Sequence, residues 1–340
     1  MYVAPRPEVE DDPLYAVRLA AAGAISFALI PLLQPTLPPL LAAVPVGLMA
    51  GMRKTFDPKK AFGAPIAFMV MVWLISMVVS LTRPMPLVLV SVMGLLYFVG
   101  FYAIQRTGNP MGMLVLAVSV LLSVMGMGSP AAFEAMRDGF YEACTVALFM
   151  IPILYAVFPS RTRDHLVETY TPAPGPHLLG AAIRAGVLLL LSFWLYTVSD
   201  ASNMMLAVVA AQVLVFPTRE SLFAEARERV ISVCLGTAVA FAALAVLTVT
   251  AHLYAVILLV FLAGLYFGSR MMRGHYPSMV YQVGLTVTLS LVAGALSTQE
   301  PGYAALTRIV LTLLGALAAA LLAAVIEALL VPSSVPARLE

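Results

Sequence analysis

One feature constrains the fold of this chain more than any other: an apolar segment near its start returns 166 positions later. The stretch from Arg18 to Phe27 reappears as Arg184 to Phe193, and Arg53 and Arg219 have the same spacing, each at the end of an apolar run. Both halves are almost wholly apolar, which predicts a duplicated membrane unit. Duplicated bundles of membrane helices are a common plan of transporters, whose substrate sites lie near mid-bilayer between the repeats.

The composition points to the bilayer as the solvent of this chain. Hydrophobic residues make up 62% of the 340 residues and charged residues only 11%, far from the quarter charged content of a soluble domain. We therefore predict an all-α, polytopic membrane protein of about twelve transmembrane helices. The expected spans are 15–33, 38–52, 61–82, 86–105, 111–128, 138–158, 180–198, 203–217, 229–250, 253–269, 276–297 and 304–331.

Six spans in each half predict two parallel repeats related by an axis along the membrane normal. The expected domains are a cytoplasmic tail (1–14), a first six-helix repeat (15–159), a linker (160–178), a second six-helix repeat (179–332) and a C-terminal tail (333–340). A helix over residues 218–230 is expected to lie at the interface and run into the ninth span. The second span is short and holds Pro38, Pro39 and Pro45; it is either broken beside a binding site or a kinked packing helix.

Basic residues are distributed unevenly between alternate loops. One set of loops and the tail hold thirteen, whereas the opposite loops hold only Arg83, Arg137 and Arg308. The positive-inside rule then places both termini in the cytoplasm. The thirteen are Arg53, Lys54, Lys59, Lys60, Arg106, Arg161, Arg163, Arg219, Arg227, Arg229, Arg270, Arg273 and Arg338.

Several classes of function have no support in the sequence. The net charge of +2 is spread over single residues and short loops, which argues against nucleic-acid binding. Cys144 and Cys234 are isolated in apolar runs and read as packing residues. Because there is no Walker loop, zinc-binding set or nucleophile elbow, we expect no cofactor, no metal and no enzymatic activity.

The second half carries a recognisable pattern. Arg227-Glu-Arg229 followed by Gly236-Thr237 resembles the "R…GT" signature that opens the third helix of a repeat in the fusaric acid resistance (FUSC) superfamily, which includes aromatic acid exporters. Tyr266-Phe267, Tyr276-Pro277 and the stretch from Arg308 to Gly315 are also similar to that family. The first half has Lys59-Lys60-Ala-Phe-Gly63 in place of the signature, and the large cytoplasmic domains of many members are missing.

The resemblance is to a compact, membrane-only branch of the superfamily. It implies an inner-membrane efflux permease of a Gram-negative cell that exports small, often aromatic, organic acids. It also implies a periplasmic adaptor of the membrane-fusion type as partner, and it leaves homo-oligomerisation open. Proton-driven export is the leading hypothesis; a passive organic-anion channel and a membrane scaffold for envelope assembly are the alternatives.

Helix-end arginines are the first candidates for binding an anionic substrate. Arg18 and Arg184 open equivalent helices at the cytoplasmic face, and Arg137 and Arg308 do so at the outer face. Arginine binds carboxylates bidentately and a helix N-terminus adds partial positive charge. For any single one of these arginines, interfacial anchoring is the commoner explanation. Aromatic residues that could stack on a substrate, or else belong to the core or the interfacial belt, are Trp73, Trp194, Tyr97 and Tyr266.

Two acidic residues within apolar spans are candidates for proton coupling. Glu142 lies five residues after Arg137, so it either takes up a proton from the periplasm or pairs with that arginine. Glu327 lies near the inner interface, where its side chain can reach water.

Overall fold

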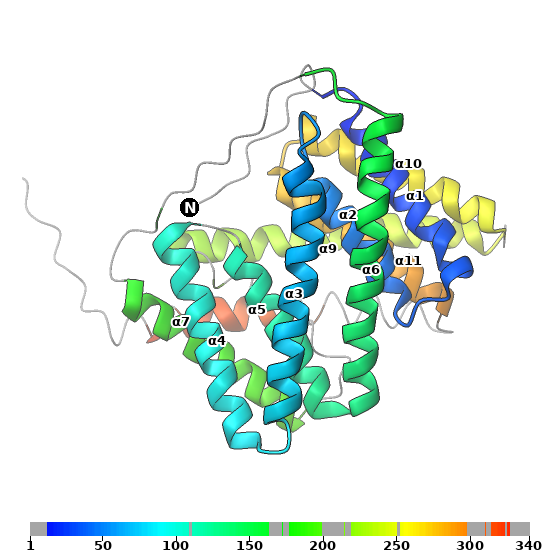
Figure 1. The fold of residues 1–340 in the computed structure, drawn as a ribbon. Coiled ribbons are helices and arrows are strands. Elements are labelled where there is room, and N and C mark those ends of the chain that lie inside the picture. Colours follow the sequence, from blue (N-terminus) through cyan, green and yellow to red (C-terminus); the bar gives the residue numbers. More distant parts are fainter. Residues whose placement is uncertain are drawn as a thin grey trace, which may run out of the picture.

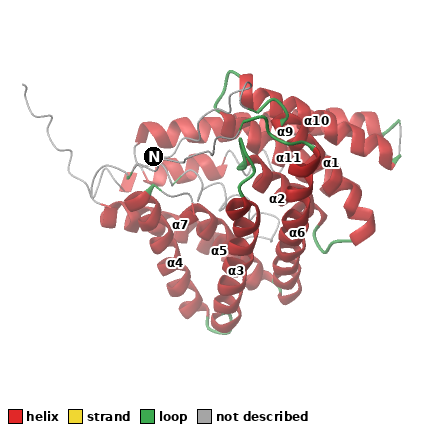
Figure 2. Cartoon of the chain, turned by 45° about the horizontal axis from the view of Figure 1, so that its top comes forward, coloured by secondary structure: helices red, strands yellow, loops and turns green. Residues whose placement is uncertain are grey.

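In the computed structural model, α-helix is the only regular secondary structure in the part of the chain that is described. That part comprises residues 12–108, 111–162, 172, 177–198, 214, 219–249, 252–297, 310, 314–323 and 325–326. Figures 1 and 2 show a bundle in which every regular element of the described residues is a helix. This arrangement satisfies the backbone polar groups within each segment, as a bilayer requires.

The first half contains six helices that match the first six expected spans. Prolines occupy the first turn of α2, α3, α4 and α6, where a missing N–H costs nothing. Asp57 and Ser129 cap α3 and α6 by accepting from backbone amides. The helices are α1 (Tyr15–Leu33), α2 (Pro38–Ala50), α3 (Pro58–Thr82), α4 (Pro86–Thr107), α5 (Met111–Gly128) and α6 (Pro130–Val157).

The second half follows the expected order where it is described. It contains α7 (His177–Val198), α9 (Arg219–Leu247), α10 (Leu253–Arg273), α11 (Ser278–Ser297) and a further helix over Leu314–Ala323. The segment predicted to run from residue 218 into the ninth span is part of one continuous α9. The eighth span (203–217) and most of the twelfth lie outside the described residues.

Eight of the described helices are long and apolar enough to cross a membrane. The second helix is not broken by its prolines: Pro38 and Pro39 begin α2, and Pro45 lies inside a continuous helix of 13 residues. At about 1.5 Å per residue, α2 spans less than the ~30 Å hydrocarbon core. The described structure therefore shows a short, intact helix at this position.

The helix bounds repeat at the spacing found in the sequence. Advancing α4 by 166 residues gives 252–273, and α10 spans Leu253–Arg273. The helix contacts are also equivalent under this spacing, which relates α1 to α7 and α4 to α10. Helix α1 packs along α10, and α4 packs along α7. Each of these two contacts joins the first half of the chain to the second.

Two hydrophobic cores form, and both combine helices from the two halves. One core contains residues of α3, α4 and α5 together with α7 and the helix over Leu314–Ala323. The other contains residues of α1 and α2 together with α9, α10 and α11. Helix α6 contributes its first part to one core and its last part to the other. The linker at 160–178 therefore separates two stretches of sequence but not two cores.

Small residues allow α1 and α10 to approach closely. A Cβ atom added to Gly264 would lie 2.6 Å from the Ala20 Cα, and one added to Gly268 would lie 2.9 Å from the Ala16 Cα. These are backbone atoms of α1, so a larger residue on α10 would force the helices apart. Small residues at this spacing are what close packing of membrane helices requires.

We expect Gly264→Ala to lower the free energy of unfolding by about 1–3 kcal/mol, because the new methyl group overlaps the α1 backbone. Thermal unfolding of the protein in detergent measures the effect. Gly47→Ala is the matched control, since a Cβ at Gly47 meets nothing within 4 Å. Equal stability of the two variants would contradict the close contact between α1 and α10.

Candidate functional site

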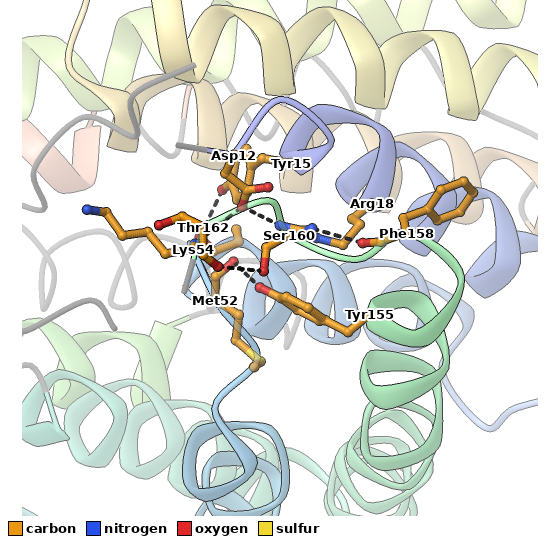
Figure 3. Close-up of polar contacts among 10 residues, drawn as sticks. Asp12, Tyr15, Arg18, Met52, Lys54, Tyr155, Phe158, Ser160 and Thr162 are labelled. Carbon is orange, nitrogen blue, oxygen red and sulfur yellow. Dashed lines mark hydrogen bonds and ion pairs between the residues drawn. The ribbon is translucent and has the colours of Figure 1, made fainter. Parts of the chain in front are cut away.

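Arg18 is completely buried in a polar cluster at one end of the bundle (Figure 3). Its guanidinium forms an ion pair with Asp12 and donates to the Phe158 carbonyl oxygen at 3.0 Å. The Tyr155 ring lies under the guanidinium, with its centroid 4.2 Å from Cζ, a cation–π contact. Asp12 also accepts from the backbone N–H of Lys54 at 3.2 Å.

The cluster joins three separate parts of the first half. The Tyr15 hydroxyl donates to the Ala50 carbonyl at 2.9 Å, and the Tyr155 hydroxyl donates to the Met52 carbonyl at 3.1 Å. The start of α1, the α2–α3 connection and the end of α6 are thereby tied together. Sequence reasoning assigned Asp12 to a tail and missed it, although its acidic side chain only six positions before Arg18 was a usable signal.

Arg18 therefore has an internal carboxylate where a substrate was expected. Taking two charges out of water is costly, and the pair is stable only as long as both members are present. The geometry assigns Arg18 a structural role in closing this end of α1.

A double-mutant cycle tests this role. Asp12→Asn and Arg18→Met should each lower the free energy of unfolding by about 3 kcal/mol, because each leaves its partner charged and buried. The double variant should lose much less than the sum, since the two residues are coupled. Additive losses in unfolding experiments would show that the pair does not act as a unit.

Arg184, which lies 166 positions after Arg18, is also buried, with 2% of its surface exposed. Its Nη1 donates to the Gly180 carbonyl oxygen at 3.0 Å within α7. Further along the α4–α7 interface, the hydroxyls of Tyr97 and Ser192 are 3.3 Å apart. Tyr97 is fully buried in this interface, whereas Tyr266 is exposed and lies beside Arg270. The two tyrosines therefore have different surroundings.

A groove between α3 and α6 contains the third candidate arginine. It has a volume of about 360 Å³ and is lined by Trp73, Ser76, Met77, Ser80, Arg137, Asp138 and Tyr141. Arg137 donates through Nε to the Asp138 carboxylate at 2.8 Å, and its side chain is 35% exposed. Trp73 is half exposed and Ser76 is buried. A guanidinium edge, two aromatic rings and serine hydroxyls can together hold a small aromatic molecule with a polar group.

Glu142 has a partner other than the arginine considered in the sequence. Its Oε1 accepts from the Thr36 hydroxyl at 2.9 Å, and its Oε2 accepts from the Thr36 backbone N–H at 3.0 Å. Arg137 pairs with Asp138 instead, because that carboxylate is its neighbour in sequence. Glu142 thus fixes the α1–α2 turn to α6.

The signature residues of the second half mainly serve packing. Arg229 forms a buried ion pair with Glu225 at 2.6 Å, as the i,i+4 spacing predicts. A Cβ at Gly236 would lie 2.9 Å from the Val287 side chain, so this glycine lets α9 approach α11. The Thr288 hydroxyl donates to the Gly236 carbonyl at 2.9 Å, whereas the buried Thr237 hydroxyl has no hydrogen-bond partner among the described residues.

The remaining sequence candidates are limited by what the structure describes. Arg308 and Glu327 lie outside the described residues. Within the described part, no group of three or more His, Cys, Asp or Glu side chains could hold a metal ion. Cys144 is buried and Cys234 is exposed; both are free thiols.

Comparison with known proteins identifies a family for part of the chain. Residues 188–322 match the family described as fusaric acid resistance protein-like, which confirms the resemblance seen in the sequence. Searches of curated proteins and of solved structures gave no match. The eight apolar helices indicate a multi-pass helical membrane protein, and residues 188–322 are similar to a membrane transport family.

Proposed function

We propose, on the premise that residues 188–322 belong to the fusaric acid resistance protein-like family, that this chain is an efflux permease for small organic acids. Aromatic carboxylates are the substrate class that we favour. The coarser role, transport of small molecules across a bilayer, follows from the family and the apolar helices. The substrate class is a proposal that rests on the α3–α6 groove.

The groove carries this proposal because its chemistry complements an aromatic acid. Its volume of about 360 Å³ falls in the range of small-molecule sites, about 300–1,000 Å³. The Asp138 carboxylate accepts a hydrogen bond from the Nε of Arg137. A guanidinium has further N–H donors, which can bind a second carboxylate bidentately. Trp73 and Tyr141 supply ring faces for stacking.

We also propose that the chain consists of two parallel six-helix repeats with a transport path between them. The 166-residue spacing of α4 and α10 supports the duplication. The matching pairs α1–α10 and α4–α7 support an axis that exchanges the two halves. The domain limits expected from the sequence stay part of this proposal.

The proposed setting is the inner membrane, with both termini cytoplasmic and a periplasmic adaptor as partner. The asymmetry of basic residues supports the orientation. The Arg18 cluster joins the start of α1, the α2–α3 connection and the end of α6. All three segments are predicted to be cytoplasmic, and their contact supports placing them on one side of the membrane. A proton gradient is the proposed energy source, and a passive anion channel is the competing function.

Purified protein in liposomes tests the function. An imposed pH gradient should drive accumulation of radiolabelled benzoate above its external concentration. A channel would instead equilibrate benzoate with the membrane voltage. Absence of any benzoate flux would contradict the proposed substrate class.

Replacement of Arg137 tests the groove. We expect Arg137→Gln to raise the KM for benzoate export at least about tenfold, because a charge-assisted pair is worth about 1.5–3 kcal/mol. Arg83→Gln is the control, since Arg83 lies on the same predicted side but does not line the groove. Equal KM values for the two variants would remove the groove from the transport path.

Replacement of Glu142 separates proton coupling from loop fixation. Glu142→Gln cannot titrate, so uphill export should be lost while downhill exchange persists. Thr36→Val removes the hydroxyl contact to Glu142 but leaves the carboxyl group in place, so this variant should still concentrate benzoate. Loss of uphill export in both variants would assign Glu142 to fixing the α1–α2 turn.

A further inference from the structure

The α3–α6 groove contains an acid beside its arginine. Of the residues that line the groove, only Arg137 and Asp138 are charged, and both belong to α6. The wall formed by α3 adds no charge, because its lining residues are Trp73, Ser76, Met77 and Ser80. The lining is therefore electrically neutral as a whole, although capture of an anion by itself would favour a positive groove.

A direct contact holds the acid against the arginine. Neighbouring residues of a helix do not face each other, so the two side chains meet because the longer one bends back. The Arg137 Nε donates to the Asp138 Oδ1 at 2.8 Å. The two side chains are 35% and 45% exposed, respectively. Both therefore remain accessible to a molecule that enters the groove.

This contact limits the number of carboxylates that the arginine can bind. A carboxylate pairs with one edge of a guanidinium through two parallel hydrogen bonds. Asp138 takes the Nε of Arg137, so the edge formed by Nη1 and Nη2 is the one at which a further carboxylate can pair bidentately. The groove can in this way hold one substrate carboxylate on Arg137.

A second negative charge on the substrate would be repelled by Asp138. Two like charges about 4 Å apart in water repel each other enough to weaken binding about fivefold. A ligand with one carboxylate offsets this repulsion by pairing with Arg137. A second carboxylate finds no further cation among the residues that line the groove.

We propose that Asp138 makes the groove selective for monoanions, so that it accepts an aromatic acid with one carboxylate and discriminates against one with two. Arg137 binds the single carboxylate, and the uncharged α3 wall contacts the ring. Asp138 determines specificity through its charge and through its hold on Arg137. The inference rests on the proposed permease function and narrows the substrate class of the same groove.

Binding of phthalate and of monomethyl phthalate to the full chain in lipid nanodiscs tests the inference. The two compounds share one ring and nearly one shape, but phthalate carries two carboxylates at neutral pH and the half-ester carries one. Titration calorimetry measures both affinities. The unaltered protein should bind the half-ester at least about fivefold more tightly than phthalate.

Replacement of Asp138 should narrow this preference. Asp138→Asn removes the charge but keeps an oxygen that can accept from the Arg137 Nε. The preference should shrink about fivefold, because a doubly charged ligand gains twice as much from the loss of the repulsion. Asp138→Ala also removes the charge and should shift the preference in the same direction. Asp57→Asn is the control, since Asp57 caps α3 outside the groove and asparagine caps equally well.

A preference that is unchanged in both Asp138 variants would overturn the inference. So would an equal shift in Asp57→Asn, or a lack of binding of both compounds to the unaltered chain. Benzoate transport in liposomes separates these failures from failure of the proposed function. Benzoate export together with an unchanged preference sinks the selectivity alone, whereas absence of any benzoate flux sinks the permease.

Discussion

Contact between the two halves of the chain is the constraint on which the rest of the structure depends. Helix α1 packs on α10 and α4 packs on α7, and both hydrophobic cores are assembled across these contacts. In a bilayer the hydrophobic effect does not hold helices together, so close packing has to do so. Gly264 and Gly268 provide it by admitting the α1 backbone at Ala20 and Ala16.

An arginine is buried at each of the two equivalent helix beginnings. Arg18 is neutralised by Asp12 and held by a carbonyl and an aromatic ring, which makes that end a fixed structural joint. At the other helix beginning, Arg184 donates through Nη1 to the Gly180 carbonyl oxygen within α7.

Much of the candidate site was visible in the sequence, but its partners were not. The spacing of 166 residues identified Arg18 and Arg184, the helix-end position identified Arg137, and charge in an apolar span identified Glu142. Sequence analysis did not identify the partner residues Asp12, Thr36 and Asp138. Each of them acts through a contact with another segment or residue, and hydrophobic periodicity gives no information about such contacts.

The sequence by itself determined the helical class, the bounds of most described helices and the family resemblance of residues 188–322, because these depend on apolar run length, proline position and local motifs. Only the tertiary structure decided which helices pair and what each buried polar group meets. Both cores cross the predicted boundary between repeats, and Arg137 and Glu142 separate to different partners. Helix pairing depends on the shape complementarity of two helix surfaces that are far apart in the chain. The pattern of residues along a single helix does not specify that complementarity.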